Sequence, residues 1–227
     1  MSLYDLIIRN GQVVAADNVT QVDIAVADGR IVAIAPVLEG TAREEIGAGG
    51  LHVFPGVIDA HLHFNEPGRA DWEGFATGTR ALAAGGTTTY FDMPLNSHPP
   101  TIDGKSFDLK LAAAQTRSLV DFGLWGGLVP GSLDRMEELV ERGVVGFKAF
   151  MSNSGIEDFQ AVDDLTLYEG MVQAARLGCI IAVHAENDAI TNLLARRAIS
   201  EGKLSVRDYL NSRPVIAELE AIIRSIL

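Results

Sequence analysis

Residues 52–64 read HVFPGVIDAHLHF, an apolar run that ends in two histidines placed two positions apart. Four further runs of this character follow: TTTYFDMP at 87–94, DFGLWGGLV at 121–129, VVGFKAFM at 144–151 and CIIAVHAE at 179–186. All are rich in β-branched and apolar residues, as strands covered on both faces of a parallel sheet must be. We expect each run to form a strand.

Helical stretches separate these strands, and we expect them at 72–84, 104–118, 132–142, 163–177 and 188–201, with a last helix from Pro214 onward. Strands that alternate with helices every ~30 residues are typical of βα units around a parallel sheet. The sequence therefore predicts an α/β fold for residues 51–227. A closed eight-stranded barrel takes about 250 residues, so about five βα modules predict only the N-terminal portion of one.

Residues 1–50 have a different pattern. Short β runs, DLIIRNGQVV, VDIAVADGRIVAIAP and TAREEIG, are interrupted by Asn10-Gly11 and Asp28-Gly29. Both dipeptides favour the tight turns of β-hairpins. We expect a small antiparallel β unit here, and hence a domain boundary near residue 50.

Composition excludes several classes of partner. The chain has 30 acidic against 18 basic residues, a formal charge of −12, which repels nucleic acid. No apolar run approaches the ~18 residues of a membrane span, so we expect no membrane partner. The single cysteine, Cys179, cannot form an internal disulfide, and its apolar setting suits a buried thiol of a reducing compartment. We expect a cytoplasmic protein.

His61 and His63 are candidate metal ligands. Residues two apart in a strand point to the same face, and these two stand at the strand's carboxyl end, where barrel active sites are built. His184 ends the fifth predicted strand at the same edge. Imidazole is a common ligand of zinc-like ions. The alternatives are an ordinary pair of strand histidines and, for His184, a structural histidine bonded to Glu186 or to a backbone carbonyl.

Lys148 lies between Phe147 and Ala149 in the fourth predicted strand. An ammonium group is costly to bury there without a partner. Either the side chain reaches solvent or an ion-pair partner, or its amine is carboxylated to a carbamate that bridges two cations. The residues alone leave both possibilities open.

Polar side chains in the loops at the same edge are candidate substrate ligands. Asn65, Asn96 and Ser152 could form hydrogen bonds with a ureide or imide, or could simply be solvated loop residues. No serine or cysteine has an evident base beside it, and no phosphate-binding glycine motif follows a strand. Nucleophilic serine or cysteine chemistry and nucleotide binding are therefore disfavoured, and no residue present is assigned as the catalytic base.

Three segments resemble the cyclic amidohydrolases: PGVIDAHLHFNEPGR at 55–69, GVVGFKAFM at 143–151 and AVHAEN at 182–187. The resemblance implies a (β/α)8 TIM-type barrel with a small β-sandwich, to which residues 1–50 would contribute the N-terminal part. It also implies a homo-oligomer, a tetramer in full-length members. Its binuclear centre would hold two divalent ions, zinc or otherwise manganese, cobalt or iron. Here the ligands would be His61, His63, carboxylated Lys148 and His184.

The loops 64–75, 87–101 and 147–156 look most like those of members that open the ring of allantoin to allantoate, by attack of a metal-bridging hydroxide on the ring carbonyl. Dihydropyrimidinase, hydantoinase or dihydroorotase activity is the alternative, although dihydroorotases carry an arginine where this sequence has Asn65. The family's sixth-strand histidine and its general-base aspartate would lie beyond Leu227. We therefore expect the 227-residue chain alone to be weak or inactive, and an inactive truncated or structural relative is a further alternative.

Overall fold

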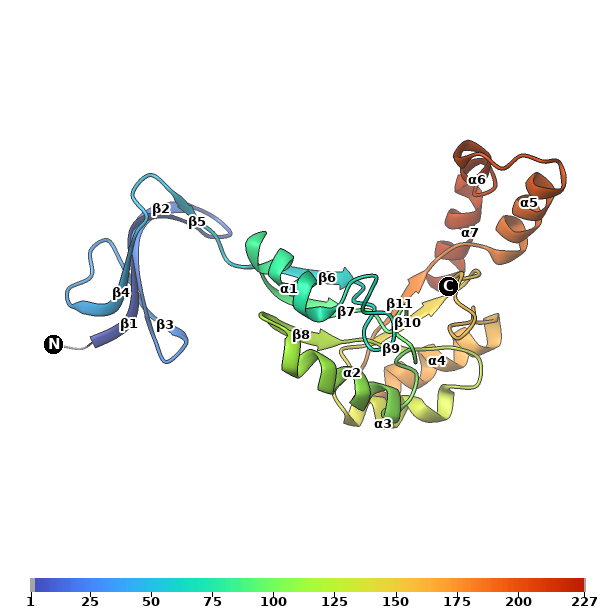
Figure 1. The fold of residues 1–227 in the computed structure, drawn as a ribbon, viewed down its shortest axis with the longest axis horizontal. Coiled ribbons are helices and arrows are strands. Elements are labelled where there is room, and N and C mark those ends of the chain that lie inside the picture. The colour runs from blue at the N-terminus through green and yellow to red at the C-terminus, as the bar shows by residue number, and fades with distance from the viewer. Residues whose placement is uncertain (1–2, 227) are drawn as a thin grey trace. The chain divides into compact units, whose positions relative to one another are not determined.

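The computed structural model describes residues 3–226 and divides the chain into two compact units, which adjoin in sequence at Gly56 and Val57 (Figure 1). The first unit is a single five-stranded sheet. Its strands are β1 (Leu3–Val14), β2 (Val19–Ala27), β3 (Arg30–Ala35), β4 (Thr41–Gly47) and β5 (His52–Val53). The pairs β1–β2 and β2–β3 are antiparallel, whereas β4 and β5 each pair with β1 in parallel. The sheet is therefore mixed, and the expectation of an antiparallel unit was wrong.

The two predicted turn dipeptides have different structures. Asp28 and Gly29 have φ of 50° and 69° and form the turn between β2 and β3, so that hairpin is confirmed. Asn10 also has a positive φ, but β1 continues through it with a bulge, and the predicted hairpin there was wrong. A Cβ atom on Gly11 would lie 2.7 Å from a methyl group of Val53. The glycine is needed for the close approach of β5.

The second unit carries two three-stranded parallel sheets. The first consists of β6 (Val57–Leu62), β7 (Thr87–Asp92) and β8 (Asp121–Leu124), and the second of β9 (Gly126–Gly127), β10 (Phe147–Phe150) and β11 (Ile181–His184). Only Trp125 separates β8 from β9, and its amide donates to Asp92 O at 3.0 Å. The amide of Val145 donates to Leu124 O at 3.0 Å. These bonds join the sheets into one wall, in which the strands follow chain order and all the carboxyl ends share one edge.

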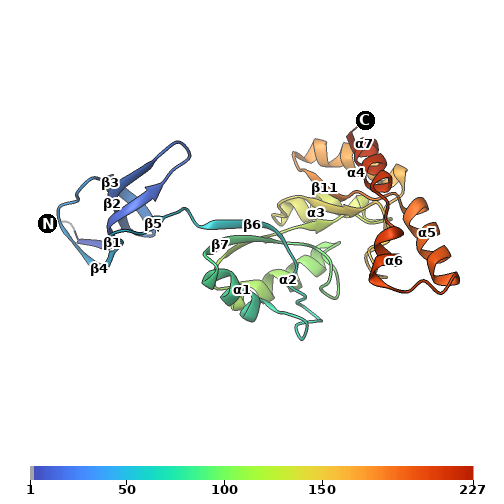
Figure 2. The ribbon, with the colours of Figure 1, turned by 90° about the horizontal axis from the view of Figure 1, so that it is seen from above.

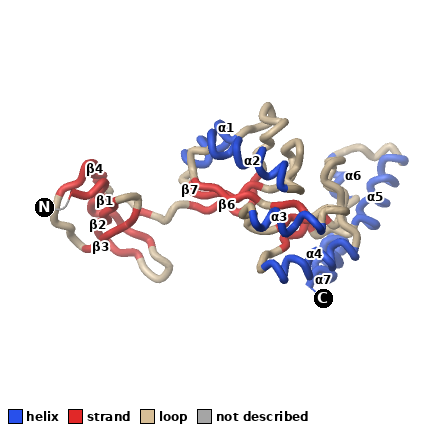
Figure 3. The backbone as a smooth tube through the Cα atoms, turned by 90° about the horizontal axis from the view of Figure 1, so that it is seen from below, coloured by secondary structure: helices blue, strands red, loops and turns tan. Residues whose placement is uncertain are grey.

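Most helices of this unit pack on the wall, and the fifth and sixth lie beyond its end (Figures 2 and 3). The helices are α1 (Phe75–Ala84), α2 (Gly104–Arg117), a 3-10 turn (Leu133–Arg135) leading into α3 (Met136–Glu141), α4 (Asp164–Leu177), α5 (Asp188–Ser200), α6 (Val206–Asn211) and α7 (Val215–Ile226). The predicted helices are confirmed in position. Helix α6 was missed because its six residues are too few to give a periodic pattern; a capping box at Ser205 begins it. The unit is therefore an α/β fold built on an open parallel wall, which is consistent with a partial barrel.

The main core lies between the β10 side of the wall and helices α3 and α4. Phe147, Leu128, Met136 and Leu139 are fully buried in it. Asp163 is the N-cap of helix α4, and its side chain accepts from the Thr166 amide at 2.7 Å. Between residues 3 and 226, the longest apolar helix falls short of what a membrane crossing requires.

Candidate metal centre

The His61 and His63 side chains lie next to each other at the carboxyl end of β6. Their ring centroids are 5.4 Å apart, with the planes inclined by 60°. His61 is exposed and His63 is partly buried. The Asp59 carboxylate accepts a hydrogen bond from the His61 amide at 3.1 Å and so steadies the strand just before the pair. The strand alternation therefore does bring the two imidazoles together.

His63 is held in its neutral form. Its pKa is lowered to about 4, mainly by burial and in smaller part by the nearby His61, Lys110 and Lys148, while the backbone at Leu95 opposes the shift. Its Nδ1 atom is buried and makes no hydrogen bond with any group of residues 3–226. An unpaired buried ring nitrogen is costly unless something binds it. A neutral imidazole with a free ring nitrogen is suited to bind a metal ion.

Lys148 and His184 come together on the neighbouring strands β10 and β11. In the register of the two strands, Phe150 pairs with His184, and the two rings stack with centroids 4.7 Å apart and planes inclined by 8°. The Lys148 Nζ atom lies 5.2 Å from the centre of the same Phe150 ring. The Phe150 ring is therefore a common neighbour of the amine and the imidazole.

Lys148 is 4% exposed, and burial lowers the pKa of its amine. Among residues 3–226, no carboxylate lies within 4.0 Å of it, so the ion-pair alternative is not what the structure contains. A buried amine without an anionic partner is the state from which carboxylation to an anionic carbamate relieves an unfavourable charge. The site therefore fits a carboxylated lysine and the cations that a carbamate would bind.

The four predicted ligands share one electrostatic environment. Partial burial lowers the pKa of His61, the positive charge of Lys148 and the proximity of His184 lower it too, and the Asp59 carboxylate opposes the shift. Over residues 3–226, no three His, Cys, Asp or Glu side chains converge closely enough to hold a metal ion by themselves. A metal site at this edge would need a ligand besides these side chains.

The three residues predicted to bind substrate differ in the hydrogen bonds that they already make within the protein. The Asn65 amide donates to Glu73 O at 3.2 Å, and Asn65 is 7% exposed, so it is used within its own loop. Asn96 has a φ of 73°, and its backbone oxygen accepts from Arg69 at 2.9 Å. Ser152 is buried, and its hydroxyl lies 3.4 Å from a Glu186 carboxylate oxygen.

One buried ion pair was missed at this edge. Lys110, on helix α2, is 1% exposed, and its Nζ atom lies 2.9 Å from the Asp92 carboxylate at the end of β7. The other Asp92 oxygen accepts from the Phe64 amide, next to His63, at 2.9 Å. Asp92 was recognisable as a strand-end carboxylate. Nothing in the sequence distinguishes Lys110 from a solvated helix lysine.

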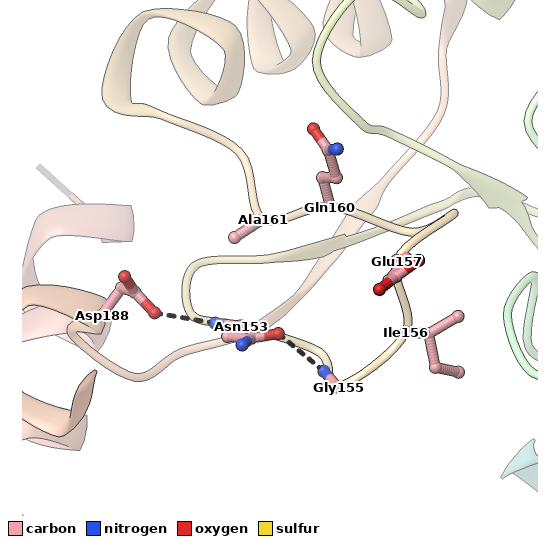
Figure 4. A pocket seen from close by; sticks show the side chains of 7 residues that line it. All are labelled: Asn153, Gly155, Ile156, Glu157, Gln160, Ala161 and Asp188. Atoms are coloured by element: carbon pink, nitrogen blue, oxygen red, sulfur yellow. Dashed lines mark hydrogen bonds between the residues drawn. The ribbon is translucent and has the colours of Figure 1, made fainter. Parts of the chain in front are cut away.

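A pocket of about 640 Å³ opens beside the loop that follows β10 (Figure 4). Asn153 lines one side of it between Asp188 and Gly155: its backbone amide donates to the Asp188 carboxylate at 2.9 Å, and its side-chain oxygen accepts from the Gly155 amide at 2.8 Å. The remaining lining residues are Ile156, Glu157, Gln160 and Ala161. The pocket begins one residue after Ser152, at the same edge as the histidines.

The fold and the site together indicate the class of protein. The fold is a parallel wall of βα units, and its carboxyl edge carries a His-x-His pair, a buried lysine and a further histidine. The chain belongs to the amidohydrolase family, whose model matches residues 52–223. Enzymes of this family generally depend on divalent metal ions.

Particular relatives are more informative. The chain is 66% identical over its whole length to an allantoinase of Rubrobacter xylanophilus, and 47% identical over 97% of its length to an allantoinase of Escherichia coli. It covers 50% and 49% of those proteins, so it spans about half the length of the curated relatives it matches. Among solved structures, an L-hydantoinase from Arthrobacter aurescens superposes with a TM-score of 0.93 at 37% identity, over 98% of this chain and 50% of that one.

Proposed function

We propose that this protein is a metal-dependent cyclic amide hydrolase that opens the hydantoin ring of allantoin to allantoate. The observation that carries the proposal is that two polar groups are buried at this edge without a partner among residues 3–226: His63 Nδ1 makes no hydrogen bond, and the Lys148 amine has no carboxylate within 4.0 Å. The 66% identity to an allantoinase supports the choice of substrate. The reaction is the hydrolysis of a cyclic amide bond, and it would belong to purine catabolism.

Two divalent ions, zinc or else manganese, cobalt or iron, would be held by His61, His63, His184 and Lys148 as its carbamate. Imidazole and carboxylate-type oxygen are ligands that such ions accept. When bound, the ions would activate water and polarise the ring carbonyl of the substrate. The finer assignment of a closed (β/α)8 barrel, with a β-sandwich that includes the first unit, belongs to the same proposal.

The residues of this chain would prepare that chemistry. Burial keeps His63 neutral, so that its ring nitrogen is available. Ser152 and Asn96, in the loops after β10 and β7, would orient the ureide groups of the substrate by hydrogen bonds. Asn65 would act less directly, because its amide already donates to Glu73 O.

Hydantoinase activity is the second candidate. It is favoured by the structural neighbours, since the L-hydantoinase of Arthrobacter aurescens and a D-hydantoinase superpose with TM-scores of 0.93 and 0.83. Hydantoin lacks the ureido substituent of allantoin, so the two substrates differ in the polar contacts that the loops must supply. Comparing the rates on allantoin and hydantoin separates the candidates.

The metal content of the purified protein tests the proposal directly. Protein prepared with zinc and bicarbonate should retain divalent metal, and His61→Ala and His63→Ala should each weaken zinc binding by at least about 100-fold, more than the loss of a supporting residue. His52→Ala is the matched control, because His52 lies in the first unit. Zinc binding equal in all four proteins would sink the proposal, as would faster turnover of dihydroorotate than of allantoin.

We also infer a cytoplasmic location and a homo-oligomeric state, a tetramer. The single cysteine, which is free, suits a reducing compartment. Exposed apolar side chains such as Val206 and Tyr209 on α6 offer a surface for self-association. Light scattering over a range of concentrations tests the assembly, and a monomer throughout would contradict it.

A further inference from the structure

The carboxylate of Glu186 joins three groups at the edge of the wall. One oxygen, Oε2, lies 3.0 Å from His184 Nε2, 2.6 Å from an Arg213 nitrogen and 3.4 Å from the Ser152 hydroxyl. Glu186 follows β11 two residues after His184, whereas Arg213 stands just before α7. Three segments distant in sequence therefore meet at one oxygen.

Arg213 is itself held in place. Its guanidinium lies over the Tyr209 ring, 4.8 Å from the ring centre, and both its own side chain and that of Glu186 are largely buried. A charge-assisted bond from a permanent cation orients the carboxylate more firmly than solvent would. The Glu186 oxygen that faces His184 is therefore set by α6 and the start of α7 rather than by β11 alone.

The bond to Glu186 uses one of the two ring nitrogens of His184. A carboxylate accepts hydrogen bonds and does not donate them, so the Nε2 atom facing it must carry the proton. In a neutral ring the lone pair then resides on Nδ1. The ring plane is fixed as well, because it stacks on Phe150, above which the Lys148 amine also lies.

We propose that Glu186, anchored by Arg213, is a positioning residue that holds His184 in the Nε2–H tautomer and presents Nδ1 as the ligand atom for a divalent cation. This inference rests on the proposed function and deepens it, because it assigns the ligating atom and the group that selects it. Histidine ligands of metals characteristically donate their second nitrogen to a carboxylate, and loss of that partner weakens metal affinity by about 10–100-fold.

Nitrogen-15 NMR of the metal-free protein reads the tautomer without any catalysis. In the full 227-residue chain, the long-range coupling pattern of His184 should be that of the Nε2–H form. In Glu186→Leu it should become a mixture of tautomers, and in Glu186→Gln, which keeps an acceptor oxygen, it should remain Nε2–H. A dominant Nδ1–H form in the unsubstituted chain, or an unchanged pattern in Glu186→Leu, would overturn the assignment.

Titration with cobalt(II) alone provides the second readout. Glu186→Leu should weaken cobalt binding by about 10–100-fold, whereas Glu186→Gln should restore most of the affinity. Glu138→Gln is the matched control, since Glu138 is also a carboxylate paired with an arginine, Arg142, but lies on α3. Equal losses in Glu186→Leu and Glu138→Gln would overturn the positioning role.

The two readouts separate this inference from the proposed function. If the unsubstituted chain shows the Nε2–H tautomer but binds no cobalt, the proposed metal site fails and the tautomer assignment stands. If it binds cobalt and the tautomer is Nδ1–H, the metal site stands and the role of Glu186 fails. Circular dichroism establishes whether each variant is folded. If Glu186→Leu does not fold, the His184 tautomer and the cobalt affinity of Glu186→Gln decide the matter.

Discussion

The Lys110 ammonium and the Asp92 carboxylate form an ion pair of 2.9 Å in which both side chains are inaccessible to solvent. Lys110 also donates to Met93 O at 2.7 Å, so it binds both the end of β7 and the residue after it. Burial raises the pKa of Asp92 to about 6, although Lys110 and the amides of Phe64 and Met93 favour the charged form. The pair fastens α2 to the strand end beside His63.

Replacing Lys110 by Met should therefore leave a buried charge without a partner. The free energy of unfolding should fall by about 3–5 kcal/mol, measured by urea denaturation of the second unit. Lys105→Met, on the exposed side of the same helix, should change it by less than about 0.5 kcal/mol. Combining Lys110→Met with Asp92→Asn should cost less than Lys110→Met alone, and an equal or larger loss would show that the pair is not what stabilises this corner.

Carboxylation of Lys148 can be observed directly. Because burial lowers the pKa of the amine, more of it is neutral near pH 8 than for an exposed lysine, and only the neutral amine reacts with carbon dioxide. Protein prepared with carbon-13 bicarbonate and zinc should give a carbamate resonance by NMR. The resonance should be missing from Lys148→Met and retained in Lys105→Met. If no carbamate resonance is seen at saturating concentrations of bicarbonate and zinc, Lys148 is not carboxylated.

The first unit should lose stability in acid through Asp23. The amides of Leu38 and Asn10, at 3.0 and 2.7 Å, and the Arg9 guanidinium hold the pKa of its carboxyl below the usual value of 3.8. Since the folded pKa is the lower one, this stabilisation is complete above about pH 5 and is lost as the pH falls through 4 and below.

Asp23→Asn should accordingly lower the free energy of unfolding of the first unit by about 1–3 kcal/mol at pH 7 and flatten its dependence on pH below 5. Hydrogen exchange of the β1 and β2 amides between pH 3 and 7 measures this without reference to the second unit. Asp17→Asn, in the exposed turn between those strands, serves as the control. An unaltered pH dependence in Asp23→Asn would contradict the role of these bonds.

Gly78 in α1 leaves room for Phe64, which directly follows His63. A Cβ atom at position 78 would overlap the Phe64 ring. Gly78→Ala should lower the free energy of unfolding by about 1–3 kcal/mol despite the higher helix propensity of alanine, and should weaken zinc binding by displacing the segment after β6. Gly85→Ala is the control. Gly85 is the C-cap of the same helix, with a φ of −82°, and a Cβ atom there would lie no closer than 3.4 Å to its neighbours. Gly85→Ala should leave the free energy of unfolding unchanged or raise it slightly. A similar fall in the free energy of unfolding in both variants would refute the packing explanation.

Much of the second unit could be predicted from local patterns. Each of the five apolar runs contains a strand, although 52–64 divides into β5 and β6, and 121–129 into β8 and β9. The period of two placed His61 and His63 side by side. Parallel strands share one carboxyl edge, so the sequence also brought Lys148 and His184 toward the pair. These features depend on residues close together in the chain, which is why the order of residues is sufficient to predict them.

Other features could not be predicted, because they depend on contacts between distant segments. The Asn10-Gly11 dipeptide became a bulge rather than a turn because β5 packs closely against Gly11 and Asp23 accepts from the Asn10 amide. The sequence left open whether His184 bonds to Glu186, and the structure contains that bond. It exists together with a free second ring nitrogen, so it is compatible with metal binding.

The sequence by itself determined the alternation of strands and helices and the placing of His61, His63 and His184 at strand ends, because hydrophobic periodicity and the alternation of side chains along a strand are local properties. Lys148 became a candidate ligand only through the resemblance to the cyclic amidohydrolases. Only the tertiary structure decided that Lys110 is buried against Asp92 and that Arg213 reaches Glu186. Burial and pairing depend on which distant segments come into contact in the folded chain. Where such contacts exclude water, they set the charge and the tautomer of each polar group and decide whether it has a hydrogen-bond partner.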